Sequence, residues 1–158
     1  MLDETKRQAI VESFRLVVPI ADTAADLFYN RLFELRPAYR ELFKPDLRRQ
    51  KNKLITMLAF IVKSLDYRDA QWAERVAEND DLFYVVLAMG KRHFELYKIP
   101  PDSFEPVGEA LLWTLEQGLG EAFTPRVRRA WVEIYGALSA TMRLSSRAKI
   151  DINRGLVA

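Results

Sequence analysis

A chain of 158 residues with 49% hydrophobic side chains is long enough for one domain with a full core. Its 24 Lys and Arg side chains nearly balance 22 Asp and Glu, and a net charge of +2 excludes a strongly cationic nucleic-acid binder. The absence of cysteine excludes disulfides, iron–sulfur clusters and thiolate zinc sites.

The first half of the chain has a helical pattern of apolar residues, without strand alternation or a hairpin signal. Asp3 is expected to open a first helix, which ends at Pro19 where a second helix begins. The second helix stops before Pro37, because the residue before a proline avoids helical geometry. A short turn over residues 37–43 follows. Pro45 and the next residue then open a long fourth helix.

The second half begins with residues 66–81, which are charged and weakly periodic and are therefore predicted to form an exposed connector. A helix with the chain's one histidine follows and ends at a double proline. Asp102 and Glu105 have the spacing of a capping box for the next helix, which is predicted to end at Gly118 or Gly120. Thr124 and the proline after it predict the start of the last helix.

His93 lies on the apolar side of its predicted helix, and two interpretations compete for it. One is a core histidine that is hydrogen-bonded to a backbone carbonyl. The other is a metal or haem ligand, since neutral imidazole is the commonest metal ligand. Without a second histidine or any cysteine, a transition-metal site made by the protein alone is poor. A haem needs only one axial imidazole and an apolar, aromatic slot.

Three segments carry a resemblance to the globin family over residues 3–143. "FYNRLFELRPAYRELF" resembles the second helix and following corner of bacterial globins and flavohaemoglobins, and "GKRH" resembles the proximal segment. The run from "FEPVGEALLW" to "AWVEIYGALSATM" is similar to the last two helices of neuroglobin. The resemblance implies an all-α globin fold of about seven to eight helices around a haem pocket, with a globin domain over residues 1–144 and a polar, flexible tail over 145–158.

The resemblance also implies the site. His93 would ligate the iron of haem b, and Phe43 would pack flat on the porphyrin. The distal residues, which would face a bound ligand, are Tyr29, Gln50 and Leu54. Lys53 and Arg92 are candidates for contacting the haem propionates, although solvated surface charges are an equally good interpretation. Four residues are expected on the proximal and inner walls: Phe104, Val107, Tyr135 and Leu138.

The chain departs from its relatives in two respects. With one histidine it cannot form the bis-histidine coordination of neuroglobin. Flavohaemoglobins place a tyrosine and a glutamate behind the proximal histidine, whereas here Phe104 takes the tyrosine position and the glutamate position falls near Ser146. We therefore expect no peroxidase-like electronic push on the iron. Few residues follow the last helix, so we also expect no flavin domain.

The expected function is reversible binding of O2, CO and NO, with NO dioxygenation as a further activity that would need a separate reductase. The alternatives are a haem-based gas or redox sensor, a globin-fold interaction module, and a DNA-associated regulator that uses "RRQKNK" and "RVRR". Solvated helix surface explains both basic clusters better, so we expect no nucleic-acid partner. Lacking a membrane-length apolar stretch and a signal-peptide pattern, the protein is expected to be cytoplasmic without a membrane partner, and a monomer or weak homodimer.

Overall fold

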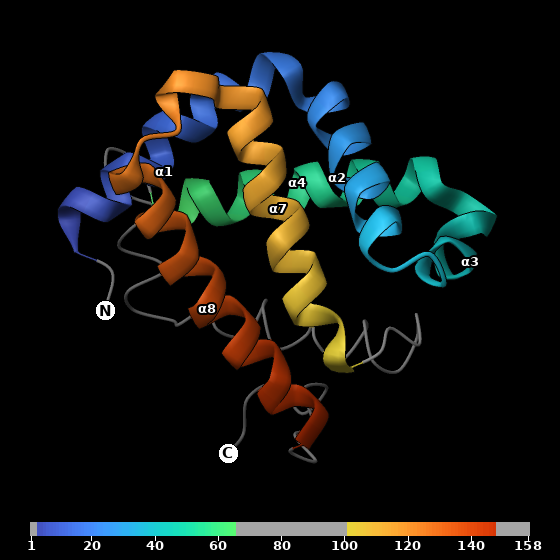
Figure 1. Cartoon of the computed structure of the whole chain (residues 1–158). Coiled ribbons are helices and arrows are strands. Elements are labelled where there is room, and N and C mark those ends of the chain that lie inside the picture. Colours follow the sequence, from blue (N-terminus) through green and yellow to red (C-terminus); the bar gives the residue numbers. More distant parts are fainter. Residues whose placement is uncertain (1–2, 66–100, 148–158) are drawn as a thin grey trace.

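The computed structural model of the protein describes residues 3–65 and 101–147, and these two ranges contain helices and no strand (Figure 1). This confirms the all-α prediction. The α-helices are α1 (Glu4–Val17), α2 (Ala21–Leu35), α3 (Tyr39–Phe43), α4 (Leu47–Leu65), α7 (Phe104–Leu119) and α8 (Pro125–Arg147). Short 3-10 turns occupy Val18–Ile20, Lys44–Asp46, Pro101–Ser103 and Gly120–Ala122.

Local sequence signals fix most of the helix ends. The Asp3 carboxylate accepts a hydrogen bond of 2.8 Å from the Lys6 N–H and caps α1. Gly120 ends α7 with φ +54°, a conformation that glycine adopts without steric penalty. The Thr124 hydroxyl accepts from the Val127 N–H at 3.2 Å and caps α8. These three ends are where the sequence predicts them.

Three other predictions about helix ends met different outcomes. The capping box of Asp102 and Glu105 is wrong, because Asp102 lies inside a 3-10 turn that passes directly into α7. The residue before α7, Ser103, has helical backbone angles and its side chain caps nothing, whereas a capping residue needs extended backbone. The predicted turn over 37–43 contains the short helix α3. Helix α8 continues beyond Ser145 into the predicted tail, and the domain boundary at 144 stays a prediction.

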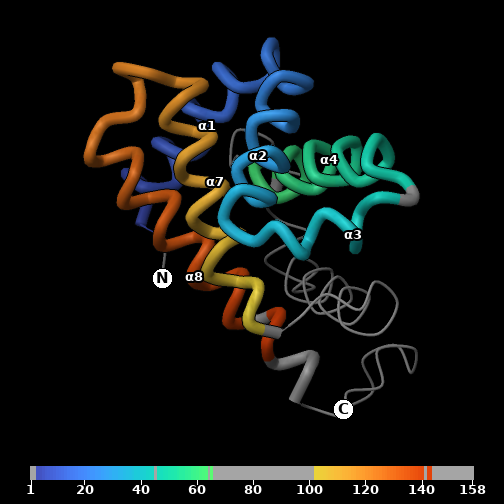
Figure 2. Tube along the Cα trace, turned by 45° about the vertical axis from the view of Figure 1, so that its right-hand side comes forward, coloured from blue at the N-terminus to red at the C-terminus, as the bar shows by residue number. Residues whose placement is uncertain are grey.

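Packing pairs helices that are far apart in the sequence. α2 lies against α7 and α1 lies against α8, while α4 packs against both α1 and α2. Figure 2 shows α1 and α8 on one side of the molecule and α3 with the start of α4 on the other. Ile10, Leu32 and Trp131 are almost fully buried where these helices meet. None of the described helices is long and apolar enough to cross a lipid bilayer.

Hydrogen bonds from buried polar side chains hold this arrangement. The Trp131 indole N–H donates to the Ser13 hydroxyl at 3.0 Å, and Ser13 donates to the Ile10 carbonyl at 3.1 Å. The Arg7 guanidinium, which is 9% exposed, donates to the carbonyl of Leu65 at 2.6 Å. Leu65 is the last residue of α4, where a cation also interacts favourably with the helix dipole. α4 is therefore anchored to α1 at its C-terminal end.

Candidate functional site

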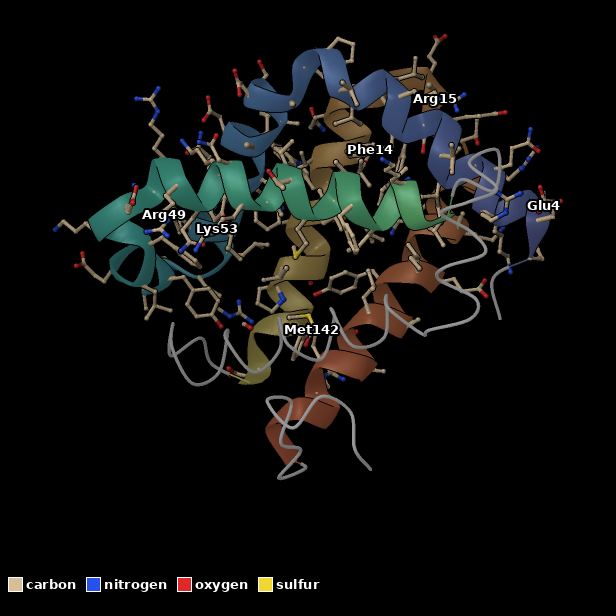
Figure 3. The ribbon with its side chains drawn as sticks, turned by 180° about the vertical axis from the view of Figure 1, so that it is seen from behind. Glu4, Phe14, Arg15, Arg49, Lys53 and Met142 are labelled. Carbon is tan, nitrogen blue, oxygen red and sulfur yellow. The ribbon has the colours of Figure 1, made fainter. Side chains whose placement is uncertain are left out.

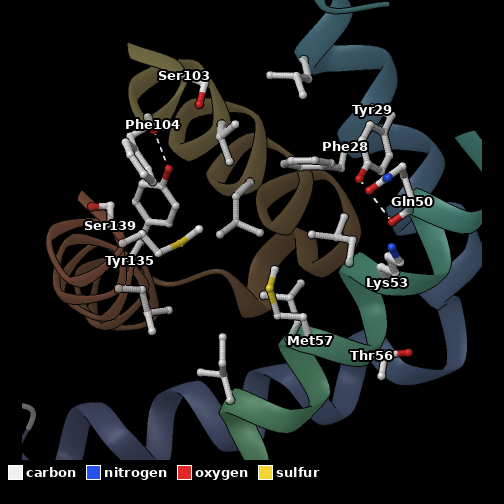
Figure 4. Close-up of a pocket in the computed structure, with 18 of the residues that line it drawn as sticks. Phe28, Tyr29, Gln50, Lys53, Thr56, Met57, Ser103, Phe104, Tyr135 and Ser139 are labelled. Carbon is white, nitrogen blue, oxygen red and sulfur yellow. Dashed lines mark hydrogen bonds between the residues drawn. The ribbon is translucent and has the colours of Figure 1, made fainter. Parts of the chain in front are cut away.

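A cavity of about 630 Å³ lies between α2, α4, α7 and α8, and residues of α3 also line it. Its volume is in the range of a site for a cofactor or a drug-sized ligand. The lining is mainly apolar and aromatic, with a few polar groups. Figure 4 shows α2 and α4 side chains on one side of the cavity and α7 and α8 side chains on the opposite side.

Tyr29 is the central side chain of the α2 wall and is 5% exposed. Its ring contacts Phe28 and Phe43, with centroid distances of 4.9 and 5.4 Å, both in edge-to-face geometry. The phenol hydroxyl donates a 3.2 Å hydrogen bond to the backbone carbonyl of Gln50 on α4 (Figure 4). Burial raises the pKa of Tyr29 well above its ordinary value, so the phenol keeps its proton and remains a donor.

Tyr135 occupies the opposite wall, on α8. Its hydroxyl donates to the backbone carbonyl of Phe104 at 2.5 Å, and burial raises the pKa of this phenol too. The ring lies against Gly108 of α7, where a Cβ atom would come within 2.6 Å of the Tyr135 Cε1 atom. The Arg143 guanidinium stacks on the Phe104 ring at 4.9 Å from its centroid. These contacts join α7 and α8 along the cavity.

The cavity reaches the surface beside α3 and the first half of α4. Among the lining side chains in residues 3–65 and 101–147, four are exposed, and all belong to this corner: Leu42, Arg49, Asn52 and Thr56. Lys53 also lines the cavity and is half-buried. In Figure 3 Arg49 and Lys53 lie close together near the N-terminal end of α4. The mouth of the cavity is therefore cationic, whereas its interior is apolar.

The structure brings nine of the sequence-predicted site residues into this one cavity: Tyr29, Phe43, Gln50, Lys53, Leu54, Phe104, Val107, Tyr135 and Leu138. They come from five helices. His93 and Arg92 lie outside the described residues, so their predicted roles stay predictions. The individual roles of the nine also remain to be tested.

Several lining residues are not among the predicted site residues, and some of them have a detectable sequence signal. Met57, Leu58 and Ile61 follow Leu54 on one helical stripe, so periodicity alone could have assigned them to the cavity. Arg49 belongs to the basic cluster "RRQKNK", for which the sequence favours solvated helix surface. Ser103 and Ser139 line the cavity without any pattern that would single them out. The tertiary contact between Gly108 and Tyr135 likewise has no local sequence signal.

Comparisons with known proteins agree with this geometry. A family model described as Globin matches residues 26–142. A neuroglobin of Tetraodon nigroviridis is 28% identical over 73% of this chain and 74% of its own length. A flavohemoprotein of Bacillus subtilis is 23% identical over 88% of this chain but only 33% of its own length. An anaerobic nitrite reductase, HBII, of Casuarina glauca is 24% identical over 91% of this chain and 92% of its own. The resemblance predicted from the sequence is confirmed.

Proposed function

Because this chain belongs to the globin family, whose members bind haem and small diatomic gases, we propose that it holds one haem b in the cavity and binds O2, CO and NO reversibly. The single observation that supports this most is the convergence of Tyr29, Gln50 and Phe43 on one apolar cavity with a cationic mouth. His93 is the proposed iron ligand.

The residues present fit a haem. A porphyrin is a flat apolar ring with two carboxylates on one edge, and this cavity pairs an apolar interior with cations at its mouth. Phe43, which is half-buried, offers an aromatic ring to the porphyrin. Lys53 and Arg49, which line the cavity, are proposed partners of the two carboxylates, and Arg92 is a further one. Val107, Phe104 and Leu138 would cover the apolar part of the ring.

When bound, haem would supply an iron centre that accepts an imidazole from the chain and binds a diatomic ligand. The chain's own contribution is to exclude water and to place hydrogen-bond donors. Tyr29 keeps its proton because burial raises its pKa. Its O–H donates to the Gln50 carbonyl, and rotating about its C–O bond would aim the same proton into the cavity. The Gln50 side chain is a second donor on the same helix face as Leu54.

Absorption spectra of the purified protein in its ferric, ferrous and ferrous–CO forms test the proposal. We expect a Soret band in the wild type and its loss in His93→Ala, with partial recovery on adding imidazole. Far-UV circular dichroism of the variant shows whether the helices survive. A His93→Ala protein that retains full haem with unchanged spectra would remove His93 from the proposal.

NO dioxygenation is the activity that the paired donors favour, and similarity to a flavohemoprotein supports it. The reaction joins NO and O2 with one electron to give nitrate, so it needs an external donor. Tyr29 and Gln50 would stabilise the negative charge that develops on the oxygen atoms. Nitrate production from NO and O2 in the presence of a reductant tests this. Nitrate formed no faster than by free haem would refute it.

A further inference from the structure

The corner around the cavity mouth carries a concentration of positive charge. Residues 36–53 contain seven Lys and Arg side chains and only two carboxylates, which gives this segment a net charge of +5 in a chain whose total is +2. The excess belongs to one place in the fold, since the segment runs from the end of α2 through α3 to the start of α4 (Figure 1).

Ion pairs neutralise only part of this charge. The Lys44 Nζ atom lies 3.7 Å from Glu41 Oε1, and the Lys51 Nζ atom lies 2.7 Å from Asp26 Oδ1. Arg36, Arg40, Arg48 and Arg49 take part in no ion pair within residues 3–65 and 101–147, and all four are exposed. We name these four arginines the basic rim.

The rim borders the opening of the cavity. Arg49 belongs both to the rim and to the cavity lining, and the exposed lining residue Leu42 lies between Arg40 and Lys44 in the chain. Arg36, Arg40 and Arg48 do not line the cavity, so their charges point to a function outside it.

We propose that the basic rim is the docking surface for a small acidic protein that carries single electrons. This docking proposal rests on the proposed function. It specifies the reductase partner by the partner's charge and by the surface on which the partner docks. A partner bound on the rim would lie against the cavity mouth, and one electron would pass to the cofactor while the partner is oxidised by one electron. No atom or proton needs to cross the interface.

Physical reasoning favours a protein over a nucleic acid. Complementary charge speeds diffusional encounter by roughly 10- to 1,000-fold at low salt, and this suits a transient electron carrier. Binding to a nucleic acid depends on neutralising many phosphates in a row. The rim has four arginines in one corner, with Glu41 and Asp46 among them.

The test uses the haem-loaded protein and a defined probe, fluorescein-labelled flavodoxin, an acidic one-electron carrier. Fluorescence anisotropy gives the dissociation constant at an ionic strength of about 0.1 M, where the Debye length is about 10 Å. We expect Arg36→Glu/Arg48→Glu to weaken binding by roughly tenfold or more. The matched control is Arg128→Glu/Arg129→Glu, which makes the same change in net charge at exposed residues of α8, away from the mouth. It should weaken binding by less than about threefold, since exposed charges beyond a Debye length are screened.

Salt and a second probe complete the design. Raising the ionic strength to about 0.5 M should abolish the difference between the two variants, because the Debye length then falls to a few ångströms. Equal weakening by both variants, or no salt-sensitive binding of flavodoxin, would overturn the proposal. Tighter, rim-dependent binding of a labelled DNA duplex would assign the rim to nucleic acid instead.

Stopped-flow reduction of the ferric protein adds a functional readout. Reduced flavodoxin should reduce the rim variant more slowly than the wild type, while neutral reduced riboflavin should reduce both at the same rate. If the rim variant were reduced more slowly by both reductants to the same extent, its haem environment would have changed. The anisotropy result would then decide whether the rim binds flavodoxin. Since anisotropy records docking without haem chemistry, a failure to bind haem and a failure to dock are distinguishable.

Discussion

Replacing Gly108 by alanine is the sharpest perturbation that the structure offers. The new Cβ atom would lie 2.6 Å from Tyr135 Cε1 and 3.2 Å from Cδ1 and Cζ, whereas carbon atoms in contact normally lie about 3.5–4.0 Å apart. The Tyr135 side chain cannot move away without a cost in free energy, because its ring is rigid and its hydroxyl is hydrogen-bonded to the Phe104 carbonyl. The ring must therefore shift towards the cavity.

Two destabilising effects and one stabilising effect determine the change in the free energy of unfolding. Overpacking costs about 1–3 kcal/mol, and losing the Tyr135 hydrogen bond adds about 0.5–1.5 kcal/mol. Replacing glycine by alanine inside a helix stabilises the folded protein by up to about 1 kcal/mol, because alanine has the higher helix propensity. With the full helix gain subtracted, we expect a net destabilisation of about 0.5–3.5 kcal/mol, or a melting temperature lower by about 1–14 °C.

Gly136→Ala is the matched control, since Gly136 lies inside α8 with open space around its Cβ position. It should stabilise the protein by about 0.5–1 kcal/mol. Urea unfolding followed by far-UV circular dichroism, at one protein and one haem concentration, measures both variants. A second control adds Gly108→Ala to a Tyr135→Leu background, where the flexible leucine can move away. The proposed clash is refuted if Gly108→Ala leaves the free energy of unfolding unchanged, or if it lowers this free energy equally in the wild type and in Tyr135→Leu.

Three further predictions follow from buried polar groups. Tyr29→Phe should speed O2 dissociation by roughly 10- to 150-fold, measured by stopped flow, because a hydrogen bond to a charged acceptor contributes about 1.5–3 kcal/mol; an unchanged rate would contradict this role. Ser13→Ala removes the acceptor of the buried Trp131 N–H and should destabilise by about 1–3 kcal/mol in urea unfolding. Above pH 10 the unfolded chain loses phenol protons that native Tyr29 and Tyr135 keep, because burial raises their pKa. The free energy of unfolding should therefore fall with rising pH by up to about 1.4 kcal/mol per pH unit for each tyrosine, and their Tyr→Phe variants should reduce this slope.

Local signals explain which parts of the fold the sequence could predict. Asp3, Thr124 and Gly120 act through their own backbone neighbours, so their effects are visible without tertiary structure. The apolar spacing on α4 likewise determines which of its faces turns inward. The capping box at Asp102 failed because the preceding turn already has helical geometry, which the residue spacing does not reveal.

The candidate site also has residues that the sequence predicts and contacts that only the tertiary structure shows. The distal residues Tyr29 and Gln50 were predicted from family resemblance, yet that resemblance could not show that the phenol proton is donated to a backbone carbonyl. The fit of Tyr135 against Gly108 joins positions in two helices that only the packing brings together. The family resemblance puts Phe104 where flavohaemoglobins have a proximal tyrosine. No local pattern shows that a phenol from α8 reaches the carbonyl of that same residue.

The start of α4 shows how one segment can serve the cavity and the surface independently. Gln50, Leu54 and Met57 turn inward, while Arg48 is exposed on the same helix without lining the cavity. A helix separates such faces because successive residues rotate about its axis, so the two sets of side chains need not share contacts. The charges of Arg36, Arg40 and Arg48 can therefore change without altering the cavity wall. For the same reason, reading the basic cluster "RRQKNK" only as solvated surface overlooks that Arg49 and Lys53 line the cavity. The linear sequence does not display that cavity.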